Sequence, residues 1–232
     1  MRRLAGALSI VLLLAGCAQT VDGKAGPAAT ALKILPTEAE ISSSAGNALS
    51  TFGFQPFIGG AEILPDGYRT DADAAPIACA EVTDTAPRLV YESLPVLEAA
   101  RQSYFNWDQG VDTSGADAAV VRLSTAAAAK HAFDAFAGQW QQCAGTTVVK
   151  HVQASVIDAA ISDVALHGSV VSATVRTHQL PSTATSRYER AVGVRGDTLV
   201  EVSLAVTSAG EKHADPQASA VRVAQSMLDK TQ

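Results

Sequence analysis

Hydrophobic residues are spaced in two ways along this chain, and the two spacings predict helices and strands in different segments. The clearest helix is expected over 125–142, where Phe133, Phe136 and Trp140 recur with the period of one helix face. Thr125 can cap its start, and Gly145 follows its end. We therefore predict an amphipathic helix with Trp140 on its buried side.

Capping patterns predict two further helices. Thr37 is followed three residues later by Glu40, which is a capping-box pattern for a short helix ending near Ala45. An apolar stripe also runs through 216–230, where Asp215 would cap the helix and a proline suits its first turn. Both patterns place a helix near an end of the folded region.

Most other apolar segments are rich in valine, isoleucine and alanine without a helical period, which predicts strands. These segments are 90–94, 100–107, 115–123, 148–152, 156–165, 170–177, 189–194 and 198–206. Turns at 110–115, 167–168 and 196–197 join neighbouring strands as hairpins. Because hairpins make antiparallel pairs, we predict an α+β fold in which an antiparallel sheet packs against helices on one face.

Residues 50–75 are rich in glycine and proline and are predicted to be a loop. This loop contains Phe52, Phe54 and Phe57. We expect them to anchor it onto the core, and a lid over a ligand is the alternative.

The N-terminal segment resembles a bacterial lipoprotein signal. Two arginines precede the apolar run 5–15, which is too short to cross a ~30 Å hydrocarbon core. The run ends at Gly16 and Cys17 in a sequence that resembles a lipobox. That resemblance implies removal of residues 1–16 and a lipid on Cys17. An ordinary signal peptide with an accidental cysteine is the alternative.

Three parts are predicted along the chain. Residues 1–16 are a signal peptide, residues 17–31 a lipidated flexible tether of small and polar residues, and residues 32–232 one folded domain. Later apolar runs are shorter than the ~18 residues of a membrane span. We therefore expect a domain held by lipid on the extracytoplasmic face of the cell membrane.

Charge and cysteine content narrow the expected partners. The formal net charge is −6 and no basic patch is visible, so nucleic acid and anionic lipid head groups are not expected partners. Besides Cys17, the chain has Cys79 and Cys143, for which a disulfide is expected in an oxidising compartment. Two free thiols or a metal pair are the alternatives. A disulfide would clamp the helix 125–142 to the segment around Cys79.

Residue patterns for catalysis, metals and cofactors are absent from the sequence. The histidines are not paired at metal-ligand spacing, and neither a nucleophile elbow nor a phosphate-binding loop is present. Asp66, Asp71 and Asp73 lack the pattern of a calcium loop, which favours a solvated acidic loop. We therefore predict no catalytic residue, no metal and no cofactor.

Two arginines in the second half, Arg190 and Arg195, have two interpretations. They would hold an anion in a cleft, or they would pair with carboxylates at exposed positions of the sheet. We favour the second interpretation, with Glu189, Glu201 or Asp197 as partners.

Taken together, the motifs resemble the PknH-like extracellular sensor domain, a family that includes mycobacterial lipoproteins and the outer domain of a protein kinase. The resemblance covers about residues 32–230 and rests on these residues: Trp140, Cys143, Gly145, Arg190, Ala191, Val194, Arg195, Val200 and Val202. It implies a twisted antiparallel sheet flanked by helices, a cleft for an unknown ligand, and no kinase activity.

One feature departs from the family pattern. Members often have a second disulfide between the position of Tyr188 and the following strand, but 199–206 contains no cysteine here. Tyr188 is expected to fill the lost volume, and Trp140, Tyr188, Arg190 and Arg195 are the candidate core or cleft residues.

The functional hypothesis is a non-enzymatic envelope lipoprotein whose domain binds a small molecule, a lipid or a protein. A structural or assembly accessory that docks on another envelope protein is the alternative, and an unrecognised hydrolase is a third hypothesis.

Overall fold

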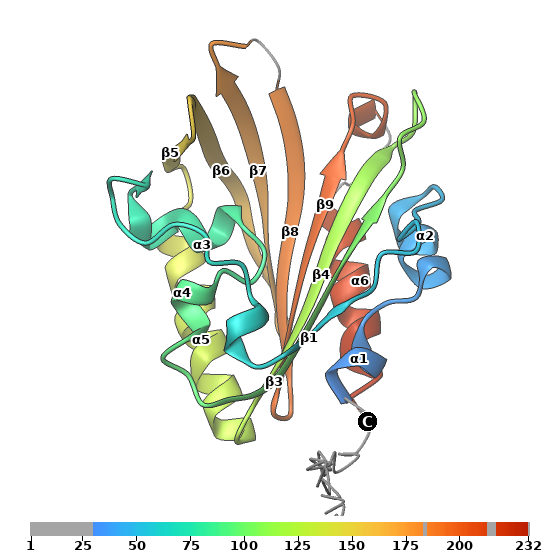
Figure 1. Cartoon of the computed structure of the whole chain (residues 1–232), viewed down its shortest axis with the longest axis vertical. Helices are drawn as coiled ribbons and strands as arrows, with labels where there is room; N and C mark the ends of the chain where they lie inside the picture. The colour runs from blue at the N-terminus through green and yellow to red at the C-terminus, as the bar shows by residue number, and fades with distance from the viewer. Residues whose placement is uncertain (1–29, 183–184, 213–216, 232) are drawn as a thin grey trace, which may run out of the picture.

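The computed structural model describes residues 30–182, 185–212 and 217–231. At its centre lies a nine-stranded antiparallel sheet with the order β1-β3-β4-β9-β8-β7-β6-β5-β2 (Figure 1). The strands are β1 (Phe57–Gly59), β2 (Ala74–Ala75), β3 (Val96–Phe105), β4 (Thr113–Leu123), β5 (Thr147–Val152), β6 (Ser155–His167), β7 (Val170–Leu180), β8 (Thr185–Arg195) and β9 (Thr198–Val206). This arrangement confirms the predicted α+β fold with an antiparallel sheet.

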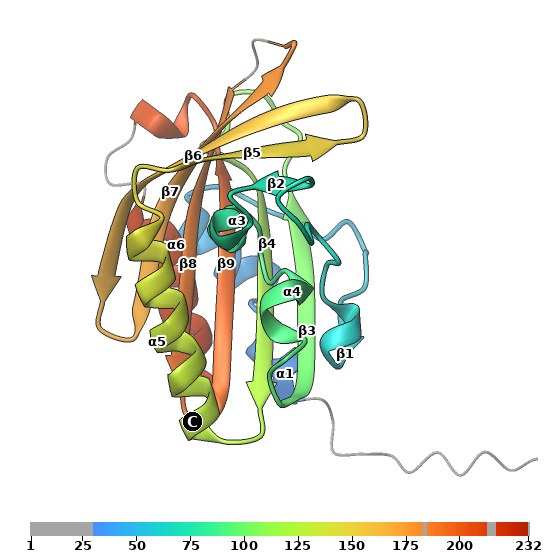
Figure 2. The same ribbon diagram turned by 90° about the vertical axis from the view of Figure 1, so that its left-hand side faces the viewer.

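Helices cover both faces of the sheet, with α3, α4 and α5 on one side and α1, α2 and α6 on the other (Figures 1 and 2). They are α1 (Thr30–Ile34), α2 (Glu38–Ala45), α3 (Ala80–Thr83), α4 (Arg88–Tyr91), α5 (Ala126–Gln142) and α6 (Gln217–Asp229). Short 3₁₀ turns are η1 (Ala61–Ile63), η2 (Ile77–Cys79) and η3 (Gly210–Lys212). The prediction of helices on one face was therefore wrong.

Side chains alternate between the two faces of the sheet along the central strands, and this explains why both faces are covered. On β9, Leu199 belongs to the core under α5, whereas its neighbour Val200 belongs to the core under α6. Successive strand residues point to opposite faces, so a strand that is apolar at both parities needs cover on both sides. The α5 core includes Phe133 and Trp140, and the α6 core includes Met227.

Several local predictions are confirmed. Thr37 and Glu40 form the capping box of α2, and Thr125 accepts a hydrogen bond from the amide of Ala128 at the start of α5. The turns at 167–168 and 196–197 join β6 to β7 and β8 to β9 as antiparallel pairs. The local sequence patterns therefore determine these caps and turns.

Other local predictions were wrong. The strand predicted over 90–94 is absent, because residues 88–91 form α4 after Pro87 and the Leu94 amide then bonds the Tyr91 oxygen in a turn. Residues 50–75 contain the short strands β1 and β2 as well as loop. Thr30 and Ala31, assigned to the tether, are the first residues of α1, and Ala31 is buried.

The three phenylalanines of the 50–75 segment do not anchor it to the core. Phe52, Phe54 and Phe57 are each more than half exposed. Phe52 stacks on Trp107 and Phe57 lies under the Arg101 guanidinium, so these rings pack against other surface groups. Cys17, the signal peptide, the tether up to residue 29 and the cap at Asp215 lie outside the described residues.

Candidate functional site

Arg190 forms the centre of a buried ionic network on the α5 face of the sheet. The side chain is 1% exposed and its guanidinium donates to the backbone oxygens of Val82 at 3.0 Å and Asp84 at 2.6 Å. It also donates to the Glu201 carboxylate at 3.0 Å. The predicted pairing of Arg190 with Glu201 is confirmed. The prediction that Arg190 is exposed was wrong, because the segment that includes Val82 and Asp84 covers this part of the sheet. With its donors engaged, Arg190 is not open to an anion.

Glu201 connects the sheet to the segment 81–86. Its carboxylate accepts a hydrogen bond from the Ala86 amide at 2.8 Å and another from the Tyr91 hydroxyl. Burial and the negative charge of Glu201 raise the pKa of Tyr91, so the phenol stays a donor. Together Arg190 and Glu201 hold residues 81–86, the end of α3 and the loop after it, against the sheet, and we call this segment the wall 81–86.

Glu81 lies at the rim of this network on α3. Its Oε1 atom is buried and has no hydrogen-bond partner. Burial and then the charge of Glu201 raise the pKa of Glu81 to about 8, although Arg190 opposes the shift. The carboxyl is therefore mainly protonated at neutral pH and offers both an O–H donor and an acceptor.

Glu81 lines a cavity of about 230 Å³ beside α3, α4 and α5, which we call the helix pocket. Most side chains in its wall are apolar, among them Ile77, Leu89 and Val90. Besides Glu81, the polar groups in the wall come from Tyr68, Asp84 and Gln139. The wall is held in place on the α5 side, because Gln139 donates to the Ala78 oxygen at 2.8 Å and Cys79 is disulfide-bonded to Cys143. The predicted disulfide is thus confirmed, and it braces this pocket.

The second acid of the helix pocket is already paired. Asp84 accepts a hydrogen bond from Lys150 at 2.6 Å, and Lys150 is only 5% exposed. Burial lowers the pKa of Lys150, while Asp84 opposes that shift. Burial also raises the pKa of Tyr68 to about 12, which keeps this phenol neutral. Of the two acids in the pocket, Asp84 is thus the one that forms an ion pair within the described residues.

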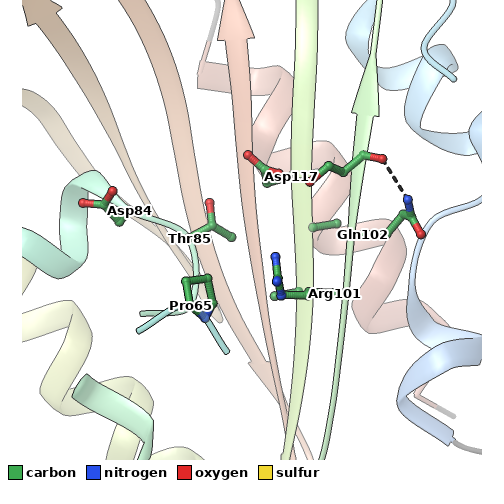
Figure 3. Close-up of a pocket in the computed structure, with 9 residues that line it drawn as sticks. Pro65, Asp84, Thr85, Arg101, Gln102 and Asp117 are labelled. Carbon is green, nitrogen blue, oxygen red and sulfur yellow. Dashed lines mark hydrogen bonds between the residues drawn. The ribbon is translucent and has the colours of Figure 1, made fainter. Parts of the chain in front are cut away.

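A second hollow of about 180 Å³ lies over β3 and β4, and we call it the sheet cleft (Figure 3). Arg101 and Asp117 come from the strands, and Pro65 and Thr85 come from the loops opposite them. The Arg101 Nε donates to the Ile63 oxygen at 2.9 Å, so this cation is held in place. Asp84 lines both hollows, so the wall 81–86 separates them.

The other sequence candidates are structural. Trp140 is 1% exposed and lies 5.7 Å from the Arg190 guanidinium, which makes it a core residue. Arg195 pairs with Asp229 at 3.0 Å and so binds the end of α6 instead of the predicted acids. Tyr188 is half-buried against the α5 core and faces Ala205 on β9.

Glu81, Tyr91, Lys150 and Arg101 were not predicted from the sequence. The one available signal was the position of Glu81 two residues after Cys79, next to the predicted disulfide. For the other three residues, partners 38 to 110 residues away in the chain define the role, and no local pattern marks them.

Two further findings concern the described part of the chain. There, no group of three or more His, Cys, Asp and Glu side chains is arranged to hold a metal ion. Among the helices of the same residues, none has the length and apolarity to cross a membrane.

Comparison with known proteins agrees with the fold. The family model of the PknH-like extracellular domain matches residues 27–230. The crystal structure of the extracellular domain of PknH from Mycobacterium tuberculosis is similar with a TM-score of 0.69 at 17% identity, over 86% of this chain and 93% of that chain. No curated protein matches significantly. Because the family model covers most of its length, this chain belongs to the family of PknH-like extracellular domains.

Proposed function

We propose that this protein is a lipid-anchored envelope protein whose extracytoplasmic domain binds a small ligand in the helix pocket without catalysis. The observation that carries the proposal is the mainly apolar cavity, whose wall includes the Glu81 carboxyl with a pKa that burial raises to about 8. A ligand with an amide, hydroxyl or amine group on an apolar body fits this chemistry.

Physical arguments favour this site over the sheet cleft. Binding pockets are mostly apolar with a few placed polar groups, and buried acids with shifted pKa values concentrate at such sites. In the sheet cleft, Arg101 and Asp117 already have partners in Ile63 and Ser103.

The binding proposal is tested by screening envelope extracts with thermal shift and native mass spectrometry. Wild-type protein should gain mass and melting temperature, and Glu81→Leu should lose most of the effect because it removes both the donor and the acceptor of the carboxyl. Asp134→Leu is the matched control, since this acid is exposed on α5 and pairs with Lys130. Equal ligand retention by Glu81→Leu and wild type would overturn the pocket assignment.

The lipid anchor at Cys17 is a separate part of the proposal, supported by the lipobox resemblance and by membership in a family of extracellular domains. Several acyl chains give durable membrane binding. Cys17→Ser should abolish labelling by a fatty-acid analogue and release the protein from the membrane fraction. Unchanged labelling and membrane retention in this variant would contradict the anchor.

A further inference from the structure

Four aromatic side chains form a continuous cluster beside the β1 edge of the sheet. The ring of Phe52 stacks on Trp107 with centroids 4.2 Å apart, and Phe105 lies 6.1 Å from Trp107 and 6.3 Å from Phe54. Phe52, Phe54 and Trp107 are 52%, 61% and 70% exposed. We call these four residues the aromatic patch. Contiguous exposed apolar surface of this kind marks an interaction site.

The backbone beneath the patch is held in a fixed shape. Phe52 has a φ of 49°, a left-handed conformation that is unfavourable for a bulky residue, and Gly53 follows with a φ of 81°. The Glu38 carboxylate restrains this turn, because it accepts hydrogen bonds from the Thr51 amide and hydroxyl at 2.6 Å and from Ser50 at 3.1 Å. The aromatic rings are thus presented by a built loop.

A groove of about 570 Å³ runs beside the patch, between it and α2. Leu49 contributes apolar surface, and Glu38 and Asp108 contribute negative charge. The groove and patch lack a basic side chain among their described lining residues. This surface therefore suits a partner that is apolar and carries no net negative charge.

The number of residues between Cys17 and α1 limits how far the domain can lie from the membrane. Residues 18–29 separate Cys17 from Thr30, and at up to ~3.6 Å per residue the domain stays within about 50 Å of its anchor. A domain on such a tether meets its own membrane at a high effective concentration. Tryptophan and phenylalanine rings also favour the interface between head groups and acyl chains.

We propose that the aromatic patch docks onto the surface of the lipid bilayer, inserts Trp107 and Phe54 into the interfacial layer, and thereby orients the domain. This inference rests on the proposed anchor at Cys17, which supplies the proximity. Neutral, zwitterionic lipid is the matching surface, because the acidic rim disfavours anionic head groups.

Trp107 provides the test, because the chain has two tryptophans and the other, Trp140, is 1% exposed. Residues 17–232 are coupled through the Cys17 thiol to a maleimide lipid in phosphatidylcholine vesicles, since Cys79 and Cys143 are joined to each other. Brominated lipid should quench the Trp107 emission and leave the buried tryptophan unaffected. Trp107→Phe should remove the quenched component.

Two serine variants separate docking from general hydrophobicity. Phe54→Ser should lower the ratio of docked to undocked protein roughly tenfold, since burial of one aromatic side chain is lost. Leu97→Ser is the control, because Leu97 is 61% exposed at the opposite end of β3 from Phe105, and it should leave the quenching unchanged.

Docking is overturned if the Trp107 fluorescence is the same with plain and brominated lipid and is still quenched by aqueous iodide. It is also overturned if protection of Trp107 requires an added envelope protein. The natural anchor is read separately from the mass of protein extracted from its own membrane. An unmodified Cys17 there would contradict the anchor, and the vesicle result would still decide the patch.

Discussion

The two faces of the sheet differ in chemistry although the same strands build both. On β8, Arg190 points to the α5 face and joins Glu201 in a buried ion pair, whereas its neighbour Ala191 points to the α6 face and packs in an apolar core. The disulfide and the helix pocket also lie on the α5 side. The comparison indicates that the α5 face holds the ionic network and the helix pocket, whereas hydrophobic packing dominates the α6 face.

Arg190→Met tests the role of the ion pair on the α5 face. It leaves Glu201 buried without its cation and releases the oxygens of Val82 and Asp84, so we expect a loss of about 3–5 kcal/mol in the free energy of unfolding. Urea denaturation measures the loss. Arg195→Met is the control and should cost about 1 kcal/mol or less, because its ion pair is exposed.

A second variant tests whether the cost of Arg190→Met comes from the unpaired charge. In Arg190→Met/Glu201→Leu both charges are absent, and part of the lost stability should return. A double variant at least as unstable as the single one would mean that the wall 81–86 depends on the hydrogen bonds of Arg190 instead.

Removing the disulfide with Cys79→Ala/Cys143→Ala should cost roughly 3–4 kcal/mol, since the bond closes a 64-residue separation in the unfolded chain. Hydrogen exchange should increase first at the end of α5 and at η2, beside the helix pocket, while α6 remains protected. Equal loosening of both faces would argue against a separate α5 layer.

On the α6 face, Met227→Ala should cost about 3 kcal/mol by leaving a cavity under a fully buried side chain. Because apolar packing supplies this stability, the loss should be the same from pH 5 to pH 8. Ligand capture by the helix pocket should persist in the folded fraction. A loss of capture in folded protein would show that the two faces are not independent.

The last prediction is a pH dependence caused by Glu81. Its pKa is about 8 in the folded protein against 4.5 as the reference value, so the folded state holds a proton that the unfolded state releases. Stability from this group is present below about pH 4.5 and lost as the pH rises to about 8. Glu81→Gln should remove this loss, as read by thermal unfolding across the same pH window.

Asp134→Asn controls for the change in net charge and should keep the wild-type pH profile. A Glu81→Gln profile parallel to wild type would mean that Glu81 is ionised and solvated in the folded protein.

Local patterns predicted much of the fold, and long-range partners determined the rest. The capping box at Thr37, the periodic helix before Cys143 and the turn at Gly196 depend on neighbouring residues, so the sequence alone indicates them. The second covered face was missed because apolar residues at both parities of β9 were taken only as a strand signal. The same pattern is typical of a strand buried on both sides.

The candidate site was less predictable for a physical reason. Arg190 was noticed, but its burial depends on Val82 and Glu201, which are brought to it by the fold. Glu81 looks like an ordinary surface acid in the sequence, and its raised pKa follows only from burial beside Glu201. Charged groups acquire such roles from tertiary contacts that leave no local period.

The most direct measurement is the titration of Glu81 by carboxyl ¹³C NMR, with Glu81→Gln used to assign the resonance. Because burial in the helix pocket keeps this carboxyl protonated, we expect a midpoint near the pKa of about 8. A midpoint near the reference pKa of 4.5 would contradict the account, because the pocket would then hold a solvated carboxylate.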